Sequence, residues 1–128
     1  MASSNGNEKR PIILVFADVE ETGDAIRKLL TVDGYSVQSA REEEDAVIVA
    51  RRQSPNFLLV NLGGNGDQVI ATARRVRHRA DLRDDVAIVI FCDPTIAEGA
   101  EIETAGNVYV TRPDNFNQLR RLIKQLLL

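Results

Sequence analysis

Short runs of strand-forming residues alternate along the chain with segments in which apolar residues recur at helical spacing. The runs cover residues 12–16, 35–38, 57–60, 86–91 and 108–110. All but the second are apolar throughout, as expected of strands that are buried on both faces of a sheet. Strands of this kind, separated by helices, form a parallel sheet with a helical layer on each face. The pattern therefore predicts a three-layer α/β fold with a five-stranded parallel sheet.

A helix is expected after each strand. The first helix ends at Gly34, and the second opens with the acidic residues 42–45, which suit the dipole at a helix start. The third covers roughly residues 67–79, and a weaker fourth helix covers residues 95–104. The apolar face of the last helix consists of Leu119, Leu122, Ile123, Leu126 and Leu127. This order leaves no room for a second domain, so residues 11–128 are predicted to form one domain.

Composition excludes several classes of protein. The chain of 128 residues is 44% hydrophobic, which is enough for the core of one domain. No apolar run approaches the roughly 20 residues of a membrane span, and residues 1–10 are small and polar, typical of a disordered lead-in rather than a secretory signal. With one Cys and one His, no cysteine-rich zinc site can form. The net charge of −3 argues against bulk binding to nucleic acid, and a cytoplasmic location is expected.

The residues that follow the predicted strands are candidate site residues, because a parallel sheet forms its ligand crevice at the carboxyl ends of its strands. Ala17 and Asp18 follow the first strand, and Asn61 follows the third. The later strands are followed by Cys92, Asp93, Thr111, Arg112 and Pro113. The chain therefore brings an acid, an amide, a thiol and a cation to one edge of the predicted sheet.

The chain resembles the receiver domain of two-component response regulators. The matching stretches are ILVFADVEE (13–21), DGYSV (33–37), SPNFLLVNL (54–62), VAIVIFCD (86–93) and NVYVTRP (107–113). The resemblance covers about residues 11–128. It implies a flavodoxin-like (βα)5 fold with strand order 2-1-3-4-5.

The resemblance also implies that the phosphorylation site has been altered. Receivers have two adjacent acids that hold Mg²⁺; Ala17 occupies the first position and Asp18 the second. Asn61 stands at the phosphoacceptor aspartate, where a carboxylate oxygen would attack phosphorus to form an acyl phosphate. An amide is a poor nucleophile, and one carboxylate is a poor magnesium site. We therefore expect no cofactor, weak or no Mg²⁺ binding and no enzymatic activity.

The remaining positions of the site are altered or retained as follows. Cys92 replaces the Ser or Thr that senses the phosphoryl group, and Arg112 replaces the Lys. Pro113 is retained after the cation, and Tyr109 is retained at the aromatic switch position. Because receivers often have a cis peptide bond at this proline, the resemblance implies one between Arg112 and Pro113. A salt bridge between Asp18 and Arg112 is a further hypothesis, in which the pair replaces the metal.

Taken together, the substitutions predict a degenerate receiver, or pseudo-receiver, that acts through protein–protein contacts without phosphorylation. By resemblance, the face spanning Thr95–Leu128 would bind a histidine kinase or an effector, or a second copy of the chain. Because the sequence ends in an apolar helix, with no output domain following, we expect either a stand-alone protein or part of a longer one.

Two alternatives remain open at this stage. A flavodoxin-like domain could bind flavin or nucleotide phosphates at the glycine-rich loop, residues 63–66, although aromatic residues make up only 5% of the chain. The basic residues of the segment Arg74–Arg79 could bind an acidic partner or nucleic acid, or could simply suit the negative end of a helix dipole.

Overall fold

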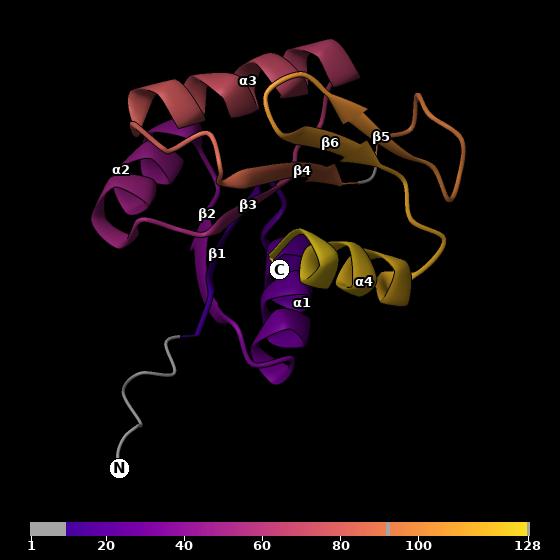
Figure 1. Ribbon diagram of the computed structural model, residues 1–128, viewed down its shortest axis with the longest axis horizontal. Helices are drawn as coiled ribbons and strands as arrows, with labels where there is room; N and C mark the ends of the chain where they lie inside the picture. The colour runs from indigo at the N-terminus through magenta and orange to yellow at the C-terminus, as the bar shows by residue number, and fades with distance from the viewer. Residues whose placement is uncertain (1–9, 92, 128) are drawn as a thin grey trace.

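The computed structural model describes residues 10–91 and 93–127. Within these residues one sheet of six strands has the order β2-β1-β3-β4-β6-β5 (Figure 1). The strands are β1 (Ile12–Ala17), β2 (Ser36–Ala40), β3 (Phe57–Asn61), β4 (Ala87–Phe91), β5 (Glu101–Thr104) and β6 (Val108–Thr111). The helices are α1 (Glu20–Val32), α2 (Glu43–Gln53), α3 (Gly66–Arg79) and α4 (Phe116–Leu127).

The five predicted parallel strands are present in the expected order. β1 pairs in parallel with both β2 and β3, β3 with β4, and β4 with β6. Helices α2 and α3 cover one face of the sheet, and α1 and α4 cover the other (Figure 1). The alternation along β1 shows why both faces need cover, because Leu14 and Phe16 pack on the α2–α3 side while Ile13 and Val15 pack on the α1–α4 side. The flavodoxin-like fold class is thus confirmed.

Helix α2 shows how the local sequence sets the helix bounds. Glu43, Glu44 and Asp45 lie in its first turn and Arg51 and Arg52 in its last, and both groups complement the dipole. The helix ends at Gln53, and the next residue, Ser54, adopts a left-handed conformation with φ of 47°. Pro55 follows and cannot continue a helix.

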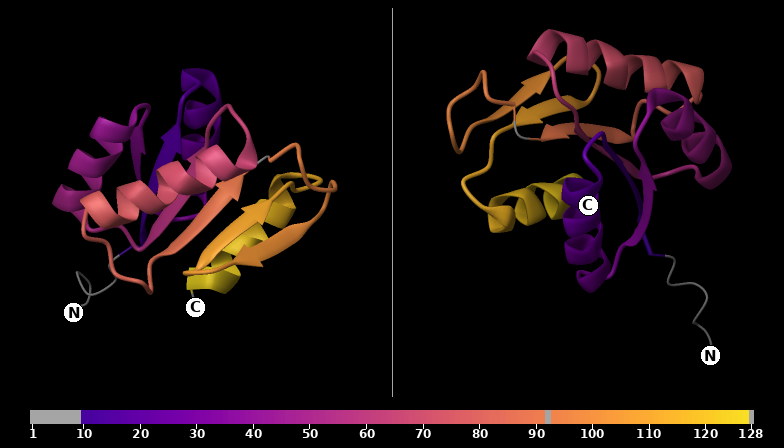
Figure 2. Two further views of the ribbon diagram at one scale, coloured as in Figure 1. Left: turned by 90° about the horizontal axis from the view of Figure 1, so that it is seen from above. Right: turned by 180° about the vertical axis from the view of Figure 1, so that it is seen from behind.

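The predicted fourth helix, residues 95–104, is wrong. After β4 the chain makes a loop and then forms β5, which pairs antiparallel with β6. The loop begins with an Asx turn, in which Asp93 Oδ1 accepts a hydrogen bond from the backbone N–H of Thr95 at 2.8 Å. Gly99 then has a φ of +85°, which is incompatible with a regular right-handed helix. The sheet therefore gains a sixth strand at its edge (Figure 2).

Some predictions fall outside the described part of the chain. The lead-in expected for residues 1–10 lies there apart from Arg10, as do Cys92 and Leu128. Among the described helices, none is long and apolar enough to cross a membrane.

Candidate functional site

The adjacent strands β1 and β3 bring the predicted pocket positions together at the carboxyl edge of the sheet. Ala17 is the register partner of Asn61, so the two positions lie side by side. The backbone N–H of Asp18, one residue on, donates to the Asn61 carbonyl at 3.4 Å. These three residues therefore lie together at the carboxyl edge of the sheet.

Asp18 is already used by the protein itself. Its Oδ2 accepts a hydrogen bond from the backbone N–H of Gly63 at 3.0 Å. A side chain on Gly63 would also bring its Cβ to 3.5 Å from that oxygen. The carboxylate thus connects the end of β1 to the glycine-rich loop after β3. It occupies the place that a bound anion would take beside the Gly63 N–H.

Ala17 lies beneath helix α1. Its side chain is 2% exposed and belongs to the core on the α1–α4 side. A Cβ built on Gly23 of α1 would lie 3.4 Å from the Ala17 Cβ, so the helix backbone passes close over this position. A methyl group fits the apolar surroundings, whereas a charged group there would lose water.

Arg112 does not pair with Asp18, so that hypothesis is wrong. Its Nη1 instead donates to the Ile96 carbonyl at 3.1 Å, and the backbone N–H of Arg112 donates to the Ala100 carbonyl at 3.1 Å. Among the described residues no peptide bond is cis, so the bond between Arg112 and Pro113 is trans rather than cis. The cation therefore stabilises the loop before β5.

Tyr109 is half-buried on β6 and packs against the core on the α1–α4 side. Its register partners are Val89 on β4 and Glu103 on β5. The ring therefore lies on the face of the sheet that α1 and α4 cover, beside the edge strand β5.

Asp93 has a structural role that the sequence did not reveal. It is only 6% exposed, and its Oδ1 also accepts from the Thr95 hydroxyl at 2.6 Å. A Cβ on Gly66, the first residue of α3, would lie 2.5 Å from Asp93 Oδ2, so a larger residue there would displace the Asp93 carboxylate from its bonds to Thr95. The Asp93-Pro94 pair was the available signal, since Asp before Pro favours a turn.

The residues at this edge do not fit a magnesium ion. In the described ranges, no three Asp, Glu, His or Cys side chains come together in a way that could hold a metal. Of the acids at this edge, Asp18 accepts a hydrogen bond from the Gly63 N–H and Asp93 accepts one from the Thr95 N–H. Mg²⁺ prefers several hard oxygen ligands in octahedral geometry, which this chain does not provide there.

The arginines of α3 make contacts within the chain. Arg75 Nη2 lies 2.9 Å from Glu43 Oε1, and Arg79 bridges Glu43 and Glu44 at 3.1 and 2.6 Å. The hydrogen bond from Arg75, with help from Arg79, lowers the pKa of Glu43 from its ordinary value of 4.5. These pairs join α3 to α2, so much of the predicted basic patch is neutralised.

Two further arginines of α3 hold the turn between β5 and β6. Arg77 donates to the carbonyls of Gly106 and Val86, the latter at 2.6 Å. Arg74 Nη2 donates to Thr104 Oγ1 at 3.2 Å and to the Ala105 carbonyl at 3.0 Å. Burial lowers the pKa of Arg77, which nevertheless stays charged at neutral pH.

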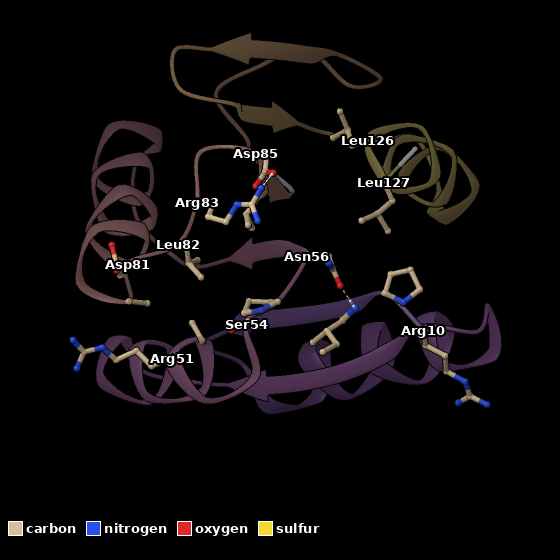
Figure 3. Close-up of a pocket in the computed structure, with 16 residues that line it drawn as sticks. Arg10, Arg51, Ser54, Asn56, Asp81, Leu82, Arg83, Asp85, Leu126 and Leu127 are labelled. Carbon is tan, nitrogen blue, oxygen red and sulfur yellow. Dashed lines mark hydrogen bonds and ion pairs between the residues drawn. The ribbon is translucent and has the colours of Figure 1, made fainter. Parts of the chain in front are cut away.

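A hollow of about 760 Å³ lies at the opposite, amino-terminal edge of the sheet (Figure 3). Its polar groups bind one another, since Arg83 pairs with Asp85 at 2.7 Å and Asn56 Oδ1 accepts from the Ile12 N–H at 2.7 Å. Figure 3 shows the side chains of Arg10 and Arg51 extending outward from its rim. The hollow therefore lacks the convergent polar groups of a ligand site.

Comparison with solved structures supports the resemblance. No protein-family model matches the sequence, and no curated protein is significantly similar to it. The receiver domain of the hybrid histidine kinase CckA is 20% identical, with a TM-score of 0.62 over 91% of this chain and 99% of that one. A CheY-like receiver domain from Methylobacillus flagellatus is 11% identical, with a TM-score of 0.69 over 92% and 99%.

The response regulator TrrA from Thermotoga maritima, solved with Mg²⁺ and BeF, is 18% identical with a TM-score of 0.66 over 91% of this chain and 98% of that one. The chain has the receiver fold. Identities this low establish the fold alone, and within the receiver fold the edge strand β5 stands where the sequence predicted a helix.

Proposed function

We propose that the chain is a receiver-like signal transduction module of two-component type that is not phosphorylated at the usual position and acts through protein–protein contacts. One observation carries the proposal. Asn61 lies in register beside Ala17, so the amide and the methyl group occupy neighbouring positions where phosphoryl transfer needs a nucleophile and a metal ligand.

The hydrogen bonding of the edge supports this proposal. The remaining acid, Asp18, accepts from Gly63, and Arg112 binds the carbonyl of Ile96. Both groups thus stabilise loops of the protein. A receiver that lacks phosphorylation chemistry can keep such fixed contacts, because it has no phosphoryl group to accommodate.

A flavodoxin-like ligand-binding function is less well supported. A flavin or nucleotide phosphate would need the backbone N–H groups of the glycine-rich loop. The carboxylate of Asp18 already accepts from Gly63 in that loop, and its negative charge repels a phosphate. Absorbance of the purified protein at flavin wavelengths distinguishes the two functions.

The proposed partner is a histidine kinase or an effector protein. One structural neighbour, the response regulator TrrA, was solved in complex with the histidine kinase ThkA. For this chain, the face that spans Thr95–Leu128 is the proposed contact surface, with homodimerisation through the same face as a second possibility. A cytoplasmic location remains a prediction from the sequence.

The test is phosphorylation in solution. The protein is incubated with acetyl phosphate and Mg²⁺, beside an active receiver as a positive control, and its intact mass is measured. We expect no stable gain of a phosphoryl group. The Asn61→Asp variant should also remain largely unmodified, because Ala17 leaves Asp18 as the one other acid at the metal-binding position. A stable phosphoryl adduct on the unaltered protein would overturn the proposal.

A further inference from the structure

The edge strand β5 is the most exposed strand among the described residues. It ends the sheet beyond β6, and no described strand lies on its outer side (Figure 2). Glu101, Ile102 and Glu103 are all exposed, Ile102 with 45% of its surface. An edge of this kind presents unpaired backbone groups to which another strand can bond.

The pairing with β6 shows which backbone groups point outward. The Arg112 N–H donates to the Ala100 carbonyl, so this opposed pair is hydrogen-bonded. In an antiparallel ladder, hydrogen-bonded and non-bonded pairs alternate. The pairs Ile102↔Val110 and Thr104↔Val108 are then bonded to β6. The N–H and C=O groups of Glu101 and Glu103 therefore point toward the open edge.

Hydrogen bonds within the chain fix both ends of β5 in the absence of a partner. Arg74 binds Thr104 and Ala105 at the end of β5, and Arg77 binds the turn at Gly106. At the other end, the Thr111 hydroxyl donates to the Ala100 carbonyl at 3.0 Å. A strand that is already ordered at both ends loses little entropy when a partner strand pairs with it.

The side chains of β5 select the charge of the partner. Glu101 and Glu103 share one face of the strand, and Ile102 lies on the other. Glu98 is exposed in the loop just before the strand, and Asp114 lies against Gly99 in the same loop. The edge is therefore acidic: Glu101, whose Oε2 also accepts from Gln118 Nε2 at 3.1 Å, and Glu103 present carboxylates on one face, and Ile102 is exposed on the other.

A second copy of β5 would be a poor partner. In an antiparallel pairing of the two open edges, Glu101 and Glu103 of one copy would lie opposite Glu101 and Glu103 of the other. Like charges directly opposite one another destabilise a strand pair. The edge thus disfavours self-association through this strand.

We propose that β5 is a docking edge for an extended basic segment of a partner protein, in which cationic and apolar residues alternate. The segment would add a seventh strand, antiparallel to β5, bonding its backbone to Glu101 and Glu103. Its cations would lie opposite the two carboxylates, and an apolar residue would lie beside Ile102. This proposal rests on the proposed function, because it names the surface and the partner chemistry of a protein–protein contact.

The test is an NMR titration of the ¹⁵N-labelled chain with an eight-residue peptide that alternates lysine and valine. We expect saturable shifts that are largest at the amides of Glu101 and Glu103. A peptide N-methylated at the lysines keeps the charge but cannot bond its backbone to the edge, and it should bind roughly tenfold more weakly or worse. A block sequence of the same composition controls for charge alone.

Substitutions in β5 of the protein test the same contact as the modified peptides. Glu103→Pro removes an outward-pointing N–H, a change that edge strands tolerate, and should weaken binding by roughly tenfold or more. Glu103→Gln removes only the charge and should have a smaller effect, while Glu21→Gln, at an exposed position of α1, serves as the matched control. If Glu103→Pro fails to fold, the N-methylated peptide still decides the question on the unaltered protein.

Three outcomes would overturn the proposal: no saturable shift at millimolar peptide, equal binding of the N-methylated peptide, or shifts centred on another surface such as α4. Failure of the proposed function is a separate result, since it is seen as a phosphoryl adduct in the mass measurement and does not depend on peptide binding.

Discussion

The two halves of the sheet share an apolar core, but the second half is also held by hydrogen bonds from arginines of α3. In the first half, made of β2, β1 and β3, buried apolar side chains pack beneath α1 and α2. In the second half, made of β4, β6 and β5, arginines of α3 reach over the sheet and bind carbonyls of the β5–β6 turn. Apolar packing requires only a suitable pattern of apolar residues along the chain. Hydrogen bonds from an arginine guanidinium require carbonyl groups at specific positions in space.

The comparison also explains where the protein departs from expectation. The first half contains every element that the sequence predicted, and it contains the Ala17–Asn61 pair at its carboxyl edge. The second half exchanges a predicted helix for β5. The proposed docking edge thus lies in the second half, at a distance in the sheet order from the Ala17–Asn61 pair of the first.

The largest predicted difference between the halves concerns apolar side chains. Leu58 on β3 is fully buried, so Leu58→Ala should lower the free energy of unfolding by about 3 kcal/mol. Ile102 on β5 is 45% exposed, and Ile102→Ala should cost only about 0.5 kcal/mol. Urea denaturation of both variants measures the contrast. Equal losses would mean that β5 is as deeply integrated as the first half.

Loss of the hydrogen bonds made by Arg77 should give the next largest change in the free energy of unfolding. Arg77→Leu keeps an apolar stem but removes the donors to Gly106 and Val86, and should cost about 2 kcal/mol. Amide hydrogen exchange should rise mainly in β5 and β6, because their turn loses its anchor. Arg83→Leu, which removes an arginine from an exposed ion pair, is the matched control and should leave exchange in that hairpin unchanged. Exchange that rises uniformly in both halves would contradict the distinction.

The smallest effect concerns the ion pairs between α2 and α3. Glu43→Gln should cost about 1 kcal/mol at neutral pH, because the Glu43 side chain is only 24% exposed and contacts two arginines. The folded-state pKa of Glu43 lies below its ordinary value of 4.5, so the folded chain binds fewer protons than the unfolded chain as the pH falls.

The stabilisation from Glu43 is therefore complete well above pH 4.5 and is lost as the pH drops through the lowered pKa. Chemical denaturation at a series of pH values should show a shallower acid dependence for Glu43→Gln than for the unaltered protein. Asp45→Asn, in the same first turn of α2, is the control for the helix dipole. Parallel pH curves for Glu43→Gln and the unaltered protein would show that these ion pairs do not contribute.

Single residues show where prediction from sequence succeeded and where it failed. The runs ending at Ala17 and Asn61 were recognisable because a buried parallel strand is apolar on both faces. The error at residues 95–104 arose because apolar spacing there was weak, while Asp93-Pro94 and Gly99 indicated a turn. The roles of Arg74 and Arg77 were hidden, since a basic helix end has the same sequence whether it is solvated or bonded to a distant turn.

The sequence by itself determined the parallel core, its strand order by resemblance, and the presence of an amide rather than a carboxylate at Asn61, because these depend on residue type and on periodicity along the chain. The tertiary structure alone decided the partners of Asp18 and Arg112, the antiparallel edge strand, and the use of the α3 arginines. Hydrogen bonds and ion pairs depend on distance and direction in space, and residues such as Arg77 and Gly106 become neighbours only when the chain has folded.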